Sequence, residues 1–81
     1  MNNKQYIKYS EALEIASNFL KKEQNLKEFC SKHKIGYENT IQIKNMNTQK
    51  EFPNLVLKIL IIFGTNYTIE LMFKNLDYER K

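Results

Sequence analysis

Residues 26–45, LKEFCSKHKIGYENTIQIKN, decide the fold. In the first half of this stretch, apolar side chains recur at helical spacing on one face: Leu26, Phe29 and Cys30. Asn25 and Glu28 have the spacing of a capping box at the start of that helix. The helix is short because Ile35-Gly36 interrupts it, and a further helix begins just after the glycine and runs through Lys44. The stretch therefore predicts two short helices joined by a tight turn.

The segment before this stretch predicts an amphipathic helix over residues 10–22. Its apolar stripe consists of Ala12, Ile15, Ala16, Phe19 and Leu20. Ser10 is the expected N-cap, and Glu11 behind it suits the positive end of the helix. Residues 1–9 are interpreted as a flexible or weakly extended arm, and residues 5–9 within it have side chains that allow a short strand.

The segment after this stretch begins with a polar loop, residues 45–51. Pro53 then favours a helix start, and Gly64 is a good stop for a helix over residues 53–63. Beyond that glycine the apolar spacing changes from that of a helix to that of a strand, which predicts a strand over residues 66–74.

Taken together, these elements predict a mainly α fold. We expect an arm at residues 1–9, a compact four-helix helix-turn-helix domain at 10–64, a β-strand at 65–75 and a polar tail at 76–81.

Composition limits what can stabilise and occupy such a small chain. With 81 residues the chain is long enough for one domain whose core is only marginally sufficient. Cys30 is the single cysteine and His33 the single histidine, so neither an internal disulfide nor a zinc cluster can form. We therefore expect no metal and no cofactor, and self-association is the support that is left. The same scarcity of paired reactive groups predicts that the chain is not an enzyme.

The charge is moderately basic, with 13 Lys and Arg against 9 Asp and Glu and a formal net charge of +4. This balance suits a polyanionic partner, but the same charge would serve solubility alone. The opening residues 1–9 are polar, unlike a signal peptide, and the longest apolar run, residues 55–63, is too short to cross a bilayer. We expect a cytoplasmic protein without a membrane partner.

The two-helix stretch resembles the helix-turn-helix of the lambda-repressor-like, Xre/Cro-type DNA-binding family. Phe29 stands at the apolar site of the first helix, Ile35 follows the turn, and Ile43 matches the apolar anchor of the recognition helix. Lys34 departs from the family, which usually has glycine at the turn. The other buried recognition-helix site falls on Thr40. Either the turn differs slightly or the register is shifted by one residue.

The resemblance extends to residues 53–64, PNLVLKILIIFG, which are similar to the fourth helix of that family. A strand after this glycine resembles the subgroup of repressors and antitoxins that pair C-terminal strands across a dimer.

The resemblance implies a set of DNA contacts. The predicted helix that begins just after Gly36 and runs through Lys44 would contact bases with its outward face, through Tyr37, Glu38, Ile41, Gln42 and Asn45. Its amides suit adenine, and Ile41 suits a thymine methyl group. The phosphate contacts would come from Lys32, Lys34 and Lys44.

The helix at residues 53–63 is apolar on nearly every side, which predicts that a second chain covers part of it. The expected dimer interface consists of Ile61, Ile62, Tyr67, Ile69, Leu71 and Phe73. The alternative is that the arm at residues 5–9 pairs with the strand inside one chain.

These features favour a homodimeric, sequence-specific regulator of transcription that binds double-stranded DNA as a repressor. Regulation of its own operon is a further expectation. The alternative is an antitoxin or a small interaction module that binds another polypeptide, such as a toxin, through the apolar helix and the strand edge.

Overall fold

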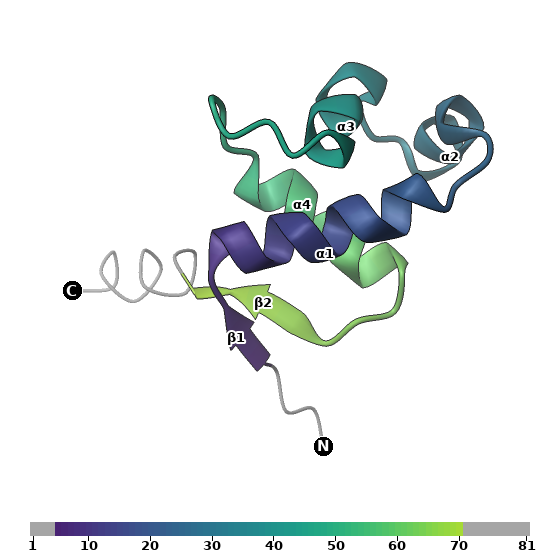
Figure 1. Cartoon of the computed structure of the whole chain (residues 1–81). Helices are drawn as coiled ribbons and strands as arrows, with labels where there is room; N and C mark the ends of the chain where they lie inside the picture. Colours follow the sequence, from purple (N-terminus) through teal and green to yellow (C-terminus); the bar gives the residue numbers. More distant parts are fainter. Residues whose placement is uncertain (1–4, 71–81) are drawn as a thin grey trace.

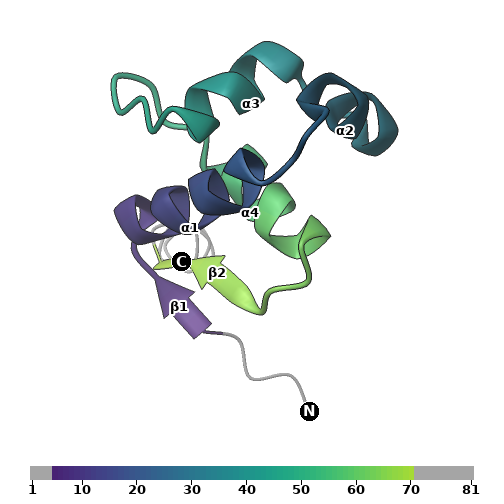
Figure 2. The same cartoon turned by 45° about the vertical axis from the view of Figure 1, so that its right-hand side comes forward.

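The computed structural model describes residues 5–70, and within that range the fold is mainly helical with a short strand at each end (Figure 1). The elements are β1 (Gln5–Ile7), α1 (Tyr9–Lys21), α2 (Leu26–His33), α3 (Tyr37–Lys44), α4 (Pro53–Ile62) and β2 (Tyr67–Ile69). The four predicted helices are all present. In two views α2 and α3 lie on one side of α1, and the two strands lie on the other (Figures 1 and 2).

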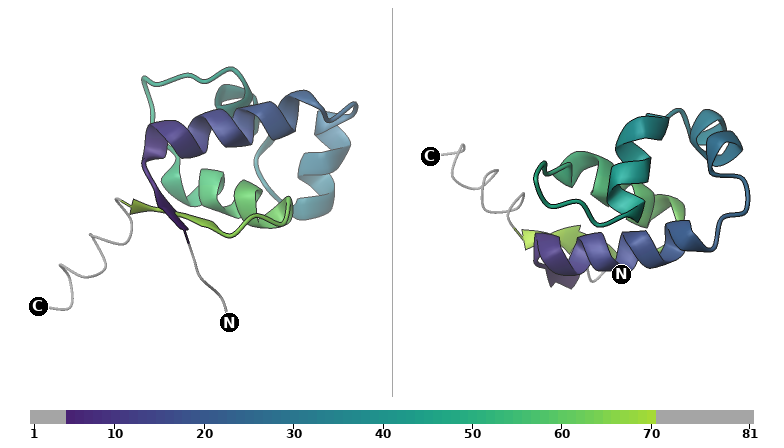
Figure 3. Two further views of the ribbon diagram at one scale, coloured as in Figure 1. Left: turned by 60° about the horizontal axis from the view of Figure 1, so that its bottom comes forward. Right: turned by 45° about the horizontal axis from the view of Figure 1, so that its top comes forward.

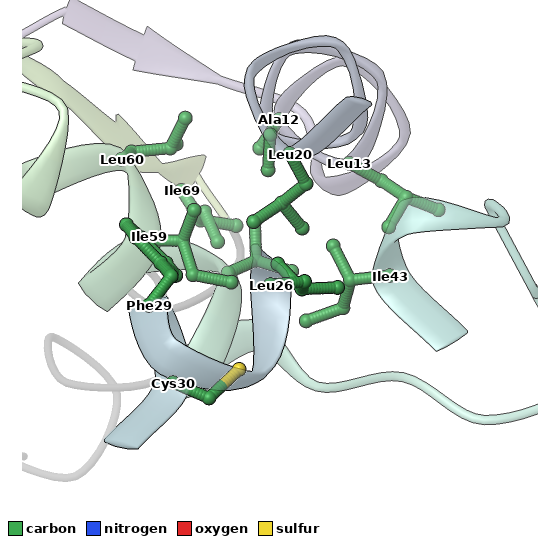
Figure 4. Close-up of a cluster of buried hydrophobic side chains, with 12 residues drawn as sticks. Ala12, Leu13, Leu20, Leu26, Phe29, Cys30, Ile43, Ile59, Leu60 and Ile69 are labelled. Carbon is green, nitrogen blue, oxygen red and sulfur yellow. The ribbon is translucent and has the colours of Figure 1, made fainter. Parts of the chain in front are cut away.

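The core lies between α1, α4 and the inner faces of α2 and α3 (Figure 4). Its fully buried aliphatic side chains include Leu13, Leu20, Ile43, Ile59 and Leu60. Each such side chain contributes about 1.5–3 kcal/mol relative to an exposed one. Because α1 and α4 pack against each other and α3 packs against α1, the core fixes the position of the two-helix stretch.

The start of α1 differs from the prediction. The helix begins at Tyr9 and its N-cap is Lys8, which makes no side-chain cap hydrogen bond. Ser10 is therefore inside the helix, and its prediction as N-cap is wrong. The Tyr9 hydroxyl accepts a hydrogen bond from the Phe52 N–H at 3.0 Å, which ties the first residue of α1 to the start of α4.

The other helix ends follow the sequence signals. Asn25 caps α2, and its Oδ1 accepts a hydrogen bond from the Glu28 N–H at 3.1 Å. Pro53 opens α4 as predicted. Gly64 follows α4 with φ +83°, and its N–H donates to the Ile61 carbonyl at 2.9 Å. This left-handed conformation costs glycine little, so the predicted stop is confirmed.

The two strands pair with each other inside the chain. β1 and β2 are parallel, with Gln5 opposite Tyr67 and Ile7 opposite Ile69. Part of the predicted arm is thus a strand, and β2 has its partner in the same chain. β2 ends at Ile69 rather than continuing through the predicted 66–74, of which 71–74 lie outside the described residues. Ile69 is fully buried in the core, where α4 packs on β2, so β2 is held against its own chain.

The apolar side chains of α4 differ widely in their exposure. Val56, Ile59 and Leu60 are fully buried, whereas Ile61 is 61% exposed. One side of α4 therefore lies on the surface of the chain. Within residues 5–70 no helix has both the length and the apolar character needed to span a bilayer.

Candidate functional site

The turn between α2 and α3 has a well-defined backbone geometry. Lys34 has φ +58°, the left-handed conformation that favours glycine, whereas Gly36 has an ordinary φ of −70°. The Ile35 N–H donates to the Cys30 carbonyl at 2.9 Å, and the Lys34 N–H donates to the Ser31 carbonyl at 3.3 Å. This pair of bonds is a Schellman motif. The left-handed residue of the turn is therefore Lys34, at the position where the sequence predicts the turn.

The inner face of α3 is fixed to the rest of the chain. Thr40 and Ile43 are buried, and the Thr40 hydroxyl donates to the Gly36 carbonyl at 2.7 Å. The buried Ser17 hydroxyl of α1 donates to the Lys44 carbonyl at 2.6 Å. The Thr40 bond is local to α3 and satisfies the buried hydroxyl, whereas the Ser17 bond crosses between the two helices. Together with the burial of Ile43, the Ser17 bond holds α3 against α1, so that the opposite face of α3 is turned outward.

The predicted base-contacting residues share that outward face. Tyr37, Glu38 and Asn45 are exposed. Gln42 is half-buried, and so is Ile41, which packs against the edge of the core rather than pointing fully outward. The face that projects most is therefore formed by polar and aromatic side chains. α3 lies on the opposite side of α1 from the strands (Figure 3).

The predicted phosphate-contacting lysines flank this face. Lys32 and Lys34 are exposed at the end of α2 and in the turn, and Lys44 is half-buried at the end of α3. Lys27 was not predicted. Its Nζ lies 5.7 Å from the centre of the Tyr37 ring, a cation–π contact that joins α2 to the first residue of α3. Its only sequence signal is a basic side chain in the first turn of α2.

The loop predicted at residues 45–51 is present, and it opens with a turn that the residue types do not indicate. Met46 has φ +57°, and the Asn47 N–H donates to the Gln42 carbonyl at 2.9 Å. The Asn47 side chain donates from Nδ2 to Gln42 Oε1 at 2.8 Å. Asn47 Oδ1 accepts from the Gln49 N–H at 2.9 Å. The predicted bidentate contact of Gln42 with adenine therefore starts from an amide oxygen that is already an acceptor.

The residues predicted for the dimer interface fall in different environments. Ile61 is exposed, and Ile62 and Tyr67 are half-buried. Ile69 is fully buried in the core of its own chain, so its side chain does not reach the surface. Leu71 and Phe73 lie outside the described residues.

The single cysteine, Cys30, and the single histidine, His33, have packing roles. Cys30 is 2% exposed and belongs to the core. Its neighbour Phe29 stands in an aromatic row, with ring centroids 5.3 Å from Phe63 and 4.7 Å from His33. Phe19 extends the row by stacking on Phe63 at 4.6 Å. His33 is thus packed at the end of α2.

Comparison of the chain with protein-family models, with curated proteins and with solved structures gave no match.

Proposed function

We propose that this chain is a sequence-specific DNA-binding regulator of transcription, a repressor that acts as a homodimer. The observation that carries the proposal is the arrangement of α3. Its inner face is anchored by Thr40 and Ile43 and by the Ser17 hydrogen bond to Lys44, and its outer face presents polar side chains at the surface. A rigid helix with an unobstructed polar face is what insertion into a major groove requires.

The side chains on this face have chemistry suited to base edges. Asn45 is exposed, and its amide can donate to the N7 acceptor of adenine and accept from the N6 amino group. Ile41 supplies an aliphatic edge for a thymine methyl group. Tyr37 and Glu38 stand at the start of the helix, where the carboxylate suits the amino group of cytosine.

Sequence-independent affinity would come from the cations around the helix. Lys32 and Lys34 project from the end of α2 and the turn, and Lys44 lies at the far end of α3. Their placement near the two ends of α3 would let them contact phosphates that border the groove.

The homodimer is supported by the surface of α4. Ile61 is 61% exposed, and half-buried Leu57 lies one helical turn before it. A second copy of the chain would remove this apolar surface from water and would present two recognition helices to a two-fold site. The same exposed surface favours a second candidate, an antitoxin-like interaction module in which a different polypeptide covers α4.

Selection of the purified protein on a random duplex library, repeated at two salt concentrations, tests the proposal. We expect enrichment of two-fold sites whose half-sites are about one helical turn apart, with retention that falls steeply as salt rises. An intact dimer that enriches no sequence would contradict DNA recognition and favour the interaction module.

A further inference from the structure

The orientation of the Gln42 amide can be assigned from its hydrogen bonds. The backbone N–H of Gln49 is a donor only, so the atom of Asn47 that accepts from it at 2.9 Å must be the oxygen Oδ1. Asn47 therefore turns Nδ2 toward Gln42 and donates to Oε1 at 2.8 Å. The oxygen of Gln42 faces Asn47, and its Nε2 amino group is left to face a partner.

The two hydrogen bonds from the Gln49 N–H to Asn47 and from Asn47 to Gln42 form a relay, and the backbone keeps this relay in place. The left-handed Met46 reverses the chain at the end of α3, and the Asn47 N–H donates to the Gln42 carbonyl at 2.9 Å. Gln42 and Asn47 are thus joined by a backbone bond and a side-chain bond. Both residues are half-buried, which limits competition from water. Among residues 5–70, no further side-chain hydrogen bond is found for Gln42.

Resting on the proposed function, we propose that Asn47 is a positioning residue that presents Gln42 as a hydrogen-bond donor, so that α3 reads guanine at the base pair facing Gln42. Adenine needs a donor and an acceptor from the same amide, and the acceptor oxygen of Gln42 is directed toward Asn47 rather than toward a base. Guanine presents two acceptors in the major groove, N7 and O6, which match an amino group. Cytosine presents its own amino group and is disfavoured.

Asn47→Asp tests this assignment because it changes one donor into an acceptor without changing shape. The aspartate keeps an oxygen for the Gln49 N–H, and its second oxygen requires the Nε2 group of Gln42 to turn inward. Oε1 then faces the DNA and accepts from the amino groups of adenine or cytosine. We expect the preference at one base pair per half-site to move from guanine to adenine or cytosine by at least about fivefold, with the other positions unchanged.

Thr48→Asp is the matched control. It places the same charge on the next residue, which is exposed and has no side-chain hydrogen bond to Gln42. It is expected to weaken binding to all sequences and to leave every base preference in place.

Gln42→Glu gives a second, independent arm. Nδ2 of Asn47 still has an oxygen to donate to, and the carboxylate now presents an acceptor outward, so cytosine should replace guanine at the same position. Thermal unfolding of each variant checks that the fold is retained.

The outcomes separate the relay from DNA binding itself. If the unsubstituted chain selects a site and both variants keep its base preferences, the relay has no role in recognition and this inference is overturned, whereas the proposed function stands. If the unsubstituted chain selects no site, both are overturned. A shift confined to one base pair supports the inference, because a merely structural role would change affinity for all sequences together.

Discussion

Replacing Lys34 by glycine is expected to make the chain more stable and, at the same time, a weaker DNA binder. Lys34 is exposed and has φ +58°, a conformation that costs a residue with a Cβ atom about 1–2 kcal/mol. Glycine removes that cost but returns about 0.5–1 kcal/mol through the greater freedom of the unfolded chain. Taking the middle of each range, the net gain should be about 0.75 kcal/mol.

Urea unfolding followed by circular dichroism measures this gain. For a small domain the dependence of unfolding free energy on urea is about 1 kcal/mol/M, so the midpoint should rise by about 0.75 M. Lys34→Ala is the matched control, because it removes the same charge and keeps the Cβ atom. Its stability should remain within about 0.5 kcal/mol of the unsubstituted chain. Equal stability of the glycine and alanine variants would refute the reasoning about the turn.

The same two variants report on function. Both remove the proposed phosphate contact, so both should weaken DNA binding equally and reduce the slope of log affinity against log salt by about one. A Lys34→Gly variant that is more stable but binds DNA more weakly would show that the strained lysine at the turn serves the phosphate contact rather than the fold. Unchanged affinity and salt slope in both variants would remove Lys34 from the binding surface.

The remaining predictions concern the anchoring of α3, the dimer and the phosphate contacts. Ser17→Ala leaves the Lys44 carbonyl without its buried donor and should lower the unfolding free energy by about 1–3 kcal/mol; no change in urea unfolding would mean that water replaces the hydroxyl. Ile61→Asp should leave the fold intact and convert a dimer into a species of the 9.7 kDa chain mass in light scattering, whereas Ile69→Asp should unfold the chain because Ile69 is fully buried. A dimer that survives Ile61→Asp would place the interface elsewhere. Lys44→Ala should weaken binding to specific and random duplexes by similar factors, and a loss restricted to the specific site would contradict a phosphate contact.

Helix positions were predictable because their causes are local. The spacing of apolar residues, the Asn25 cap, Pro53 and Gly64 each act within a few residues, and the structure confirms them. The inward placement of Thr40 and Ile43 was implied by the resemblance to the helix-turn-helix family, and both side chains are buried.

The pairing of β1 with β2 depends on residues far apart in the chain. Three residues of an arm carry too little alternation to identify a strand, and its partner is chosen by burial of Ile69 against α4. The strand pairing within one chain was therefore only an alternative at the level of sequence.

The details of the site depend on backbone conformations that the residue types do not announce. Lys34 and Met46 both take the left-handed conformation without being glycine. The second of these turns brings Asn47 back to Gln42, so the relay is invisible until the turn is known. Residues that break a local preference in this way are where sequence reasoning has least power.

We propose that the outer face of α3 enters DNA. The most direct measurement is a two-dimensional amide NMR titration of the ¹⁵N-labelled chain with a short duplex at low salt, where non-specific binding is strongest. The account predicts that the largest shift changes fall at Lys34, Tyr37 and Asn45, together with the Asn47 side-chain amide, and that the exposed side of α4 is unaffected. Changes centred on Ile61 with α3 unperturbed, or no changes at all, would contradict it.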